Sequence, residues 1–248
     1  MRSLASLFNP SRRADFSARQ TLTIIGLAGL VSLLLMTLPW LGWFNYPFRL
    51  LLTMVHELGH GLAALLTGGH FISFVVLPNG AGLAQTAGGW RLVVIPAGYL
   101  GVAVFGAGLI MLGRSHRWGR MALGIIGGLM MLLSLRYGLP GILYLDILSG
   151  ILTTLVGVIF GGLLVWVAVK APPGWIIFLI HLIAIQAVFI AFSDLLGLIG
   201  LSARFSPPEN DARSMAELTF IPAIIWALLW VVEAVALIGG AIWVTWRD

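Results

Sequence analysis

The amino-acid sequence predicts an all-α polytopic membrane protein of about six to seven transmembrane helices, with a short membrane-associated β-hairpin after the second helix. Hydrophobic residues make up 60% of the 248 positions and charged residues only 9%, and the mean hydropathy is +1.03. Soluble domains are about half apolar and about a quarter charged, so this composition is typical of a chain that lies in lipid. Apolar runs of about 20 residues recur along the chain, and this length crosses a bilayer core of about 30 Å.

Turn-forming and polar residues separate the apolar runs and set the limits of the expected spans. Residues 1–20 are a basic tail, and residues 21–248 form a single transmembrane domain. Gly68-Gly69 ends the second run, Pro172-Pro173-Gly174 ends the fifth, and residues 202–217 are the one clearly polar loop. We expect spans at about residues 21–42, 47–67, 91–113, 118–137 and 142–170, from the proline break to about 200, and at 218–245.

Residues 70–90 have the composition of a β-hairpin and not that of a span. The stretch FISFVVL is rich in β-branched and aromatic residues, PNGAG is a turn sequence, and LAQTAGG is a weaker second strand. Strands that face lipid are excluded at bilayer depth, because their free backbone groups would have no partner. We therefore expect the hairpin to lie at the membrane interface or to be covered by helices.

The charged residues indicate contact with a lipid bilayer. The net charge is +5, the pI is about 10.4, and the bases gather in the N-terminal tail and around residues 114–120. Such clusters suit loops held against anionic lipid, so we expect no nucleic-acid partner. The chain has no cysteine, which excludes thiolate metal sites. The oligomeric state and the orientation in the membrane stay open.

Three ionisable residues stand inside the second expected span, in the segment TMVHELGHGLAALLTGG of residues 53–69. A charged side chain at this depth costs about 2.5–3.5 kcal/mol on insertion scales, so intramembrane ionisable residues are functional by default. Residues four apart on a helix lie on one face, and His56 and His60 can therefore direct two imidazoles at one metal ion. A plainer interpretation is that His56, Glu57 and His60 only bond to one another and to the backbone. A pairing role needs one partner, however, and not three residues on adjacent faces.

The spacing is the H-E-x-x-H pattern that zinc hydrolases carry on a helix. Zn²⁺ lowers the pKa of its bound water to about 7 and polarises a scissile carbonyl. Glu57 lies beside the two histidines and is the candidate general base that holds this water and takes its proton. Gly59, Gly61 and Ala63-Ala64 are small, which lets neighbouring helices approach the motif.

The segment HELGHGLAALLTGG resembles the zinc-binding helix of site-2-type intramembrane metalloproteases, especially their bacterial M50B-like branch. The expected hairpin follows this helix as the membrane-associated strands do in that family. PAGYLG at residues 96–101 resembles the start of the next helix, although the family's Gly-Pro-x-x-Asn form is absent. The resemblance covers about residues 47–112, and NDARSMAELTFIPAIIW at residues 210–226 resembles the entry to that branch's last span.

Two imidazoles leave a zinc site short of a third protein ligand. The resemblance implies an aspartate in a Leu-Asp-Gly motif on a later span. The best match is YGLPGILYLDILSG, where Asp146 opens the fifth expected span and Ile147 replaces the glycine. Asp146 is therefore the first candidate, and Asp194, which is also intramembrane, is the main alternative. Asp211 stands in the polar loop and is more simply explained as a cap for the last span.

These residues lead to an expected function. We expect an integral, multi-pass protein of the bacterial inner membrane, in which His56, His60 and Asp146 hold Zn²⁺ and Glu57 is the catalytic base. The expected activity is hydrolysis of peptide bonds in membrane-protein or peptide substrates within or near the bilayer, with the substrate added as a strand to the hairpin. The alternative is a non-proteolytic regulator that binds a metal or a peptide on the same scaffold. A transporter is disfavoured, because no inverted repeat is visible.

Overall fold

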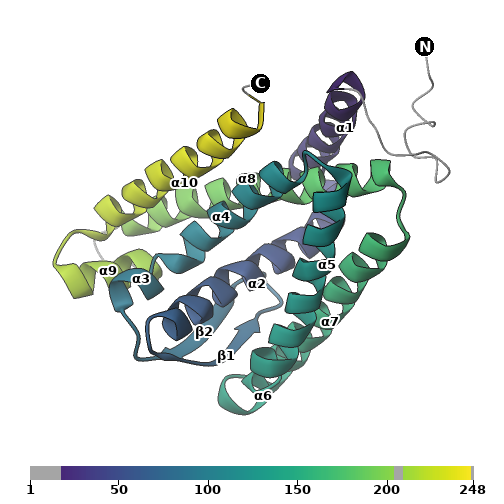
Figure 1. Ribbon diagram of the computed structural model, residues 1–248. Coiled ribbons are helices and arrows are strands. Elements are labelled where there is room, and N and C mark those ends of the chain that lie inside the picture. Colours follow the sequence, from purple (N-terminus) through teal and green to yellow (C-terminus); the bar gives the residue numbers. More distant parts are fainter. Residues whose placement is uncertain (1–17, 204–208, 247–248) are drawn as a thin grey trace.

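Helices form most of the protein, which the computed structural model describes over residues 18–203 and 209–246 (Figure 1). The long helices are α1 (Ala18–Thr37), α2 (Gly42–Leu66), α4 (Ala97–Leu112), α5 (His116–Leu133), α7 (Ile147–Lys170), α8 (Pro173–Ser202) and α10 (Ala223–Trp246). The shorter elements are η2 (Pro39–Leu41), β1 (His70–Val76), β2 (Gly82–Ala87), α3 (Arg91–Val94), η3 (Ser134–Gly138), α6 (Gly141–Tyr144) and α9 (Asp211–Thr219).

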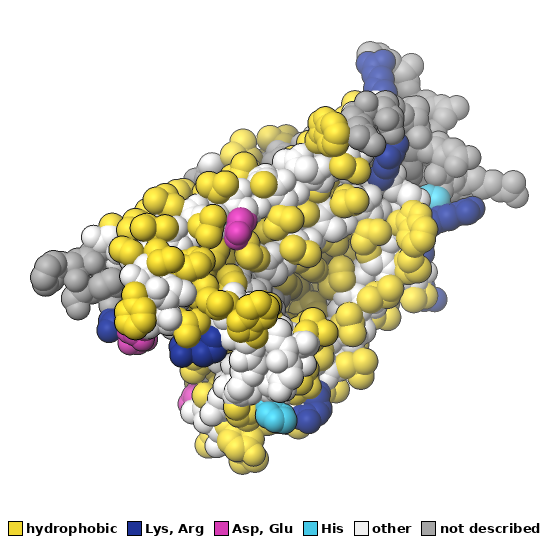
Figure 2. Space-filling model, turned by 60° about the vertical axis from the view of Figure 1, so that its left-hand side comes forward, with side chains coloured by type: hydrophobic (Ala, Val, Ile, Leu, Met, Phe, Trp, Pro, Cys, Tyr) yellow, Lys and Arg dark blue, Asp and Glu magenta, His cyan; other side chains and the backbone are white. Residues whose placement is uncertain are grey.

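Five of the described helices are long and apolar enough to cross a membrane, namely α1, α5 with its extension to Tyr144, α7, α8 and α10. Hydrophobic side chains cover much of the outer surface (Figure 2). The predicted all-α membrane fold is confirmed, but five spans satisfy this criterion where about six to seven were expected. The other two expected spans are α2, which carries the ionisable motif, and α4, which has only 16 residues.

Helix α8 lies at the centre of the bundle and contacts α1, α4, α5 and α10. Helix α2 lies between α4 and the β-hairpin, and α5 and α7 pair on the other side of the hairpin (Figure 1). The main apolar core includes Met54, Phe74, Leu109, Leu123 and Ile180, which come from five different elements. The ionisable face of α2 is thus surrounded by packed protein and is kept away from lipid.

The two strands form the antiparallel hairpin that the sequence predicts within residues 70–90. The turn uses the side chain of Asn79, whose Oδ1 accepts a hydrogen bond from the Ala81 N–H at 2.9 Å, and Gly80 adopts a φ of +84° that a glycine tolerates. Strand β1 packs against α2 and α7, and the Val76 N–H donates to Thr153 Oγ1 at 2.6 Å. The hairpin was expected either at the membrane interface or covered by helices, and the structure shows helices covering β1. The backbone groups of β1 therefore have hydrogen-bond partners away from lipid.

Glycines set the close approach of α5 and α7. A Cβ atom on Gly161 would lie 2.5 Å from the carbonyl oxygen of Gly127 and 2.6 Å from Met131 Cγ. A Cβ atom on Gly157 would collide with Ser134 Oγ. By contrast, the adjacent Gly162 has open space at its Cβ position. This contact depends on small residues, as is common between membrane helices.

We predict that Gly161→Ala destabilises the protein, because the added methyl group meets backbone that cannot rotate away. Overpacking of this kind costs about 1–3 kcal/mol. The melting temperature in detergent should fall, whereas Gly162→Ala, the matched control one residue further on, should leave it unchanged or raise it slightly. Equal melting temperatures for the two variants would contradict the close α5–α7 contact.

Candidate metal centre

Helix α2 presents His56 and His60 on the face that meets the start of α4. The two Nε2 atoms are 3.1 Å apart, and the rings are inclined at 77°. Gly98 of α4 lies directly opposite, because a Cβ atom there would collide with Nε2 of His56 and lie 2.5 Å from Nε2 of His60. On α2 itself, a Cβ atom on Gly59, which directly precedes His60, would collide with the carbonyl oxygen of Ala97. Two glycines therefore let α4 close over the imidazoles.

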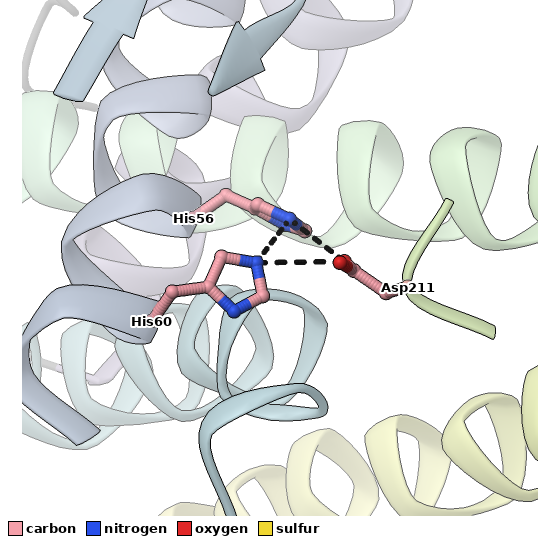
Figure 3. A group of neighbouring side chains, drawn as sticks. All are labelled: His56, His60 and Asp211. Atoms are coloured by element: carbon pink, nitrogen blue, oxygen red, sulfur yellow. Dashed lines mark hydrogen bonds and ion pairs between the residues drawn. The ribbon is translucent and has the colours of Figure 1, made fainter. Parts of the chain in front are cut away.

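Asp211 completes a group of three ligand atoms with the two histidines (Figure 3). Its Oδ2 lies 3.3 Å from His56 Nε2 and 3.4 Å from His60 Nε2. The carboxylate comes from the first residue of α9, more than 150 positions after the motif. All three side chains point toward one common centre.

The donor set and its dimensions fit a zinc ion. Zinc binds imidazole nitrogen at about 2.0–2.1 Å and carboxylate oxygen at about 2.0–2.2 Å, so two ligands of a tetrahedral site are about 3.4 Å apart. The three observed separations are 3.1, 3.3 and 3.4 Å. Three protein ligands with nitrogen and oxygen donors also leave a fourth position for a reactant, as in catalytic zinc sites.

Backbone and aromatic contacts orient the histidine rings. His60 Nδ1 lies 2.8 Å from the carbonyl oxygen of Val94, which can only accept, so Nδ1 donates to it and Nε2 is the ring nitrogen that faces the centre. The ring of His56 meets the ring of Tyr99 edge to face with centroids 4.6 Å apart, and Tyr99 stacks on Trp230. These contacts fix both rings before any ion binds.

The position of Asp211 is set by the N-cap of α9. Asn210 occupies the N-cap of α9, and its Oδ1 accepts a hydrogen bond from the Arg213 N–H at 2.9 Å. The Asp211 side chain is thereby free to turn inward. Burial alone would raise the pKa of this carboxyl, but its interactions with His56 and His60 outweigh burial and hold the pKa below the ordinary value. The carboxylate form, which is the form that binds metal, is therefore favoured.

The structure does not place Asp146, the expected third ligand, with the histidines. Asp146 is the exposed N-cap of α7, and its Oδ2 accepts the Ser149 N–H at 2.8 Å. Hydrogen bonding from the side chain and then the backbone of Ser149 lowers the pKa of this carboxyl. Asp194, the main alternative, lies on α8 and pairs with Arg49 at 3.5 Å. Each carboxylate thus has another partner, and the geometry points to Asp211 as the third ligand.

The sequence carried one signal that could have identified Asp211. The Glu209-Asn210-Asp211 run offers two good N-cap residues in succession, and only one can cap the helix. An N-cap at Asn210 makes Asp211 the first helical residue, with its side chain available for another contact. The cap belongs to the separate helix α9 and not to the last span, which begins at Ala223.

Glu57 is buried, with 5% of its surface exposed, and lies beside the two histidines where β2 begins. A Cβ atom on Gly82 of β2 would collide with Glu57 Oε1, so the strand passes directly against the carboxylate. The backbone of Ala84 is within hydrogen-bonding reach of Glu57. This places a carboxylate at the metal-binding group without making it one of the three ligands.

A cavity of about 710 Å³ opens in front of these residues. Its walls include His56, Glu57, His60 and Asp211, together with Arg49 and Asp194 further along. Residues 80–84 of the hairpin form another part of the wall. The cavity is large enough for several residues of an extended peptide, and the ligand group lies at its surface.

The fold and this site define an integral membrane protein with an H-E-x-x-H helix and a His-His-Asp group able to hold a metal ion. The model of the Peptidase M50B-like family matches residues 24–241, which extend from α1 into α10 and contain every residue of the site. The chain therefore belongs to the M50B-like family, membrane metallopeptidases of the site-2 protease type, as the resemblance in the motif predicted. Neither the curated proteins nor the solved structures contain a match to the chain.

We predict that the purified protein binds about one equivalent of zinc and that Asp211→Ala weakens this binding more than Asp146→Ala does. Loss of a ligand should reduce zinc affinity at least 100-fold, more than the loss of a residue that only hydrogen-bonds to a ligand. The measurement is zinc content after dialysis against graded chelator, with His56→Ala as the positive control for loss. If Asp146→Ala lost zinc and Asp211→Ala kept it, the assignment from geometry would be overturned.

Proposed function

We propose that this protein is an intramembrane zinc metalloprotease that hydrolyses peptide bonds of membrane-protein substrates within or near the bilayer. The observation that carries the proposal is the convergence of His56, His60 and Asp211 on one centre beside a buried, non-ligating glutamate. Family membership supports the same class of activity. A site that only stored a metal ion would need the three ligands but not the adjacent Glu57.

His56, His60 and Asp211 would hold the zinc ion. When bound, zinc supplies a Lewis acid that polarises the scissile carbonyl and makes water a better nucleophile. Glu57 takes the proton from the attacking water at a carboxylate oxygen and then gives it to the nitrogen of the leaving amine. Burial of Glu57 against β2 limits the contact of its carboxylate with bulk water.

We also propose that the substrate binds as an extended strand beside β2. A peptide bond inside a helix has its carbonyl engaged in the helix, so a cleavable segment must first unwind. Residues 82–84 of β2 line the cavity next to Glu57, and the other strand, β1, is already covered by α2 and α7. Backbone pairing with β2 would present a carbonyl to the ligand group and hold it there. A bacterial inner membrane is the proposed location.

We predict that Glu57→Gln keeps zinc and fold but abolishes cleavage, because an amide cannot accept the proton. Removal of a general base lowers the rate by about 10²–10⁴-fold. New peptide N-termini should appear by mass spectrometry in membranes of cells that make the wild type and be missing with Glu57→Gln. Glu217→Gln, which changes an exposed acid on α9 in the same way, should match the wild type.

The regulator alternative gives a different result in the same experiment. With zinc bound in both proteins, wild type and Glu57→Gln would produce the same set of N-termini. That outcome would contradict the proposed protease activity but not the proposed metal site.

A further inference from the structure

Glu233 is an acid in the middle of the last span that the metal centre does not use. It is the eleventh of the 24 residues of α10, which places it about 15 Å from the start of the helix and about 20 Å from its end. The side chain is partly exposed on the outside of the bundle. Its exposed neighbours Leu229, Val232 and Leu237 are all apolar. A carboxylate therefore faces the centre of the lipid core.

Within residues 18–203 and 209–246, Glu233 has no hydrogen bond and no ion pair. Helix α10 packs against α4, α8 and α9. Neither α4, α8 nor the described part of α10 contains lysine or arginine, and Arg213 of α9 pairs with Glu209 and Glu217. The other two acids within the long helices of the described chain are both partnered. Asp194 pairs with Arg49, and Glu57 lies beside His56 and His60. An unpartnered acid in a span is costly, so a cation from outside the bundle is the missing group.

The surface around Glu233 is shaped for another helix. Ala236 and Gly240 follow Glu233 by three and seven residues, so the three lie on one side of α10. Ala236 and Gly240 are exposed, and a Cβ atom on Gly240 would meet nothing within 4 Å. Small residues four apart let two membrane helices bring their backbones together. A partner helix could thus approach closely enough for a central side chain to reach the carboxylate.

We propose that the Glu233–Ala236–Gly240 side of α10 docks a single transmembrane helix of another protein, one that carries a lysine or arginine in the middle of its span. A partner with an apolar centre would leave the carboxylate unpaired. A second copy of this chain would bring a second carboxylate to the same depth and no cation from α4, α8 or α10. The charge of the surface therefore selects a basic partner. This docking does not depend on the protein being a protease.

The test uses the full-length protein in lipid nanodiscs and synthetic transmembrane peptides of leucine and alanine. One peptide carries lysine at its centre, one carries leucine there, and one carries its lysine near an end. Binding is measured by energy transfer between labelled protein and labelled peptide. Intramembrane polar contacts in model helices predict that the lysine-centred peptide binds about 5–30-fold more tightly than the other two.

Variants then assign the preference to this surface. Glu233→Leu should abolish the preference for central lysine, and Glu233→Gln should reduce it, because the amide keeps a hydrogen bond but not the charge. Neither change removes a hydrogen bond or ion pair within the described residues, so melting temperatures should equal or exceed that of the wild type. Ala236→Leu should weaken the binding of all three peptides, because the larger side chain keeps the peptide helix away from α10. Val235→Leu, the matched control on another side of α10, should change nothing.

Two results would overturn the proposal. The first is equal binding of the lysine-centred and leucine-centred peptides, or a lysine preference that survives in Glu233→Leu. The second is self-association of the wild type that depends on Glu233, with no preference for the lysine-centred peptide. That result would show that this surface binds a second copy of the chain.

Discussion

The arrangement of this protein depends on one electrostatic constraint, which is that two imidazoles on a buried helix face need an anionic partner that lipid cannot provide. Helix α2 can place His56 and His60 one turn apart, but no residue of α2 itself supplies a third ligand at that centre. The carboxylate is brought by α9, a short helix that enters between the ends of α8 and α10. Asp211 keeps its charge there because the imidazoles compensate for burial.

The same constraint explains why the structure around α2 is built from small residues. Helix α4 and the hairpin cover the part of α2 that carries the two histidines and Glu57, and bulky residues at these contacts would hold both elements away from it. Gly59 and Gly98 admit α4, whereas Gly61 admits the ring of Phe71 from β1. Gly82 lets β2 pass directly against the carboxylate of Glu57. Four glycines on three sides of one helix thus convert an apolar span into a site closed from lipid.

Much of this could be predicted from the sequence, because the relevant signals are local. Apolar runs gave the helices, the PNGAG turn gave the hairpin, and the i, i+4 spacing placed His56, Glu57 and His60 together. The third ligand depends on a long-range contact, which no local pattern encodes. Asp146 matched a motif, but a first-turn N–H from Ser149 holds its carboxylate. The choice between Asn210 and Asp211 as helix cap rests on one residue of register, and only the packed structure decides it.

Charge balance also separates the roles of the three acids that lie within the long helices of the described chain. Glu57 is buried against protein, next to two histidines and a strand, so it can change protonation without contact with lipid. Asp194 is neutralised by Arg49, and this pair joins α8 to α2 along one wall of the cavity. These two carboxylates are compensated inside the molecule, one for chemistry and one for structure. Glu233 instead lies on the outside of the bundle, and we propose that a basic residue on a transmembrane helix of another protein compensates its charge. The described part of the bundle therefore directs two acids inward to the site and leaves the third on its surface, where the proposed basic helix of another protein would complete the pairing.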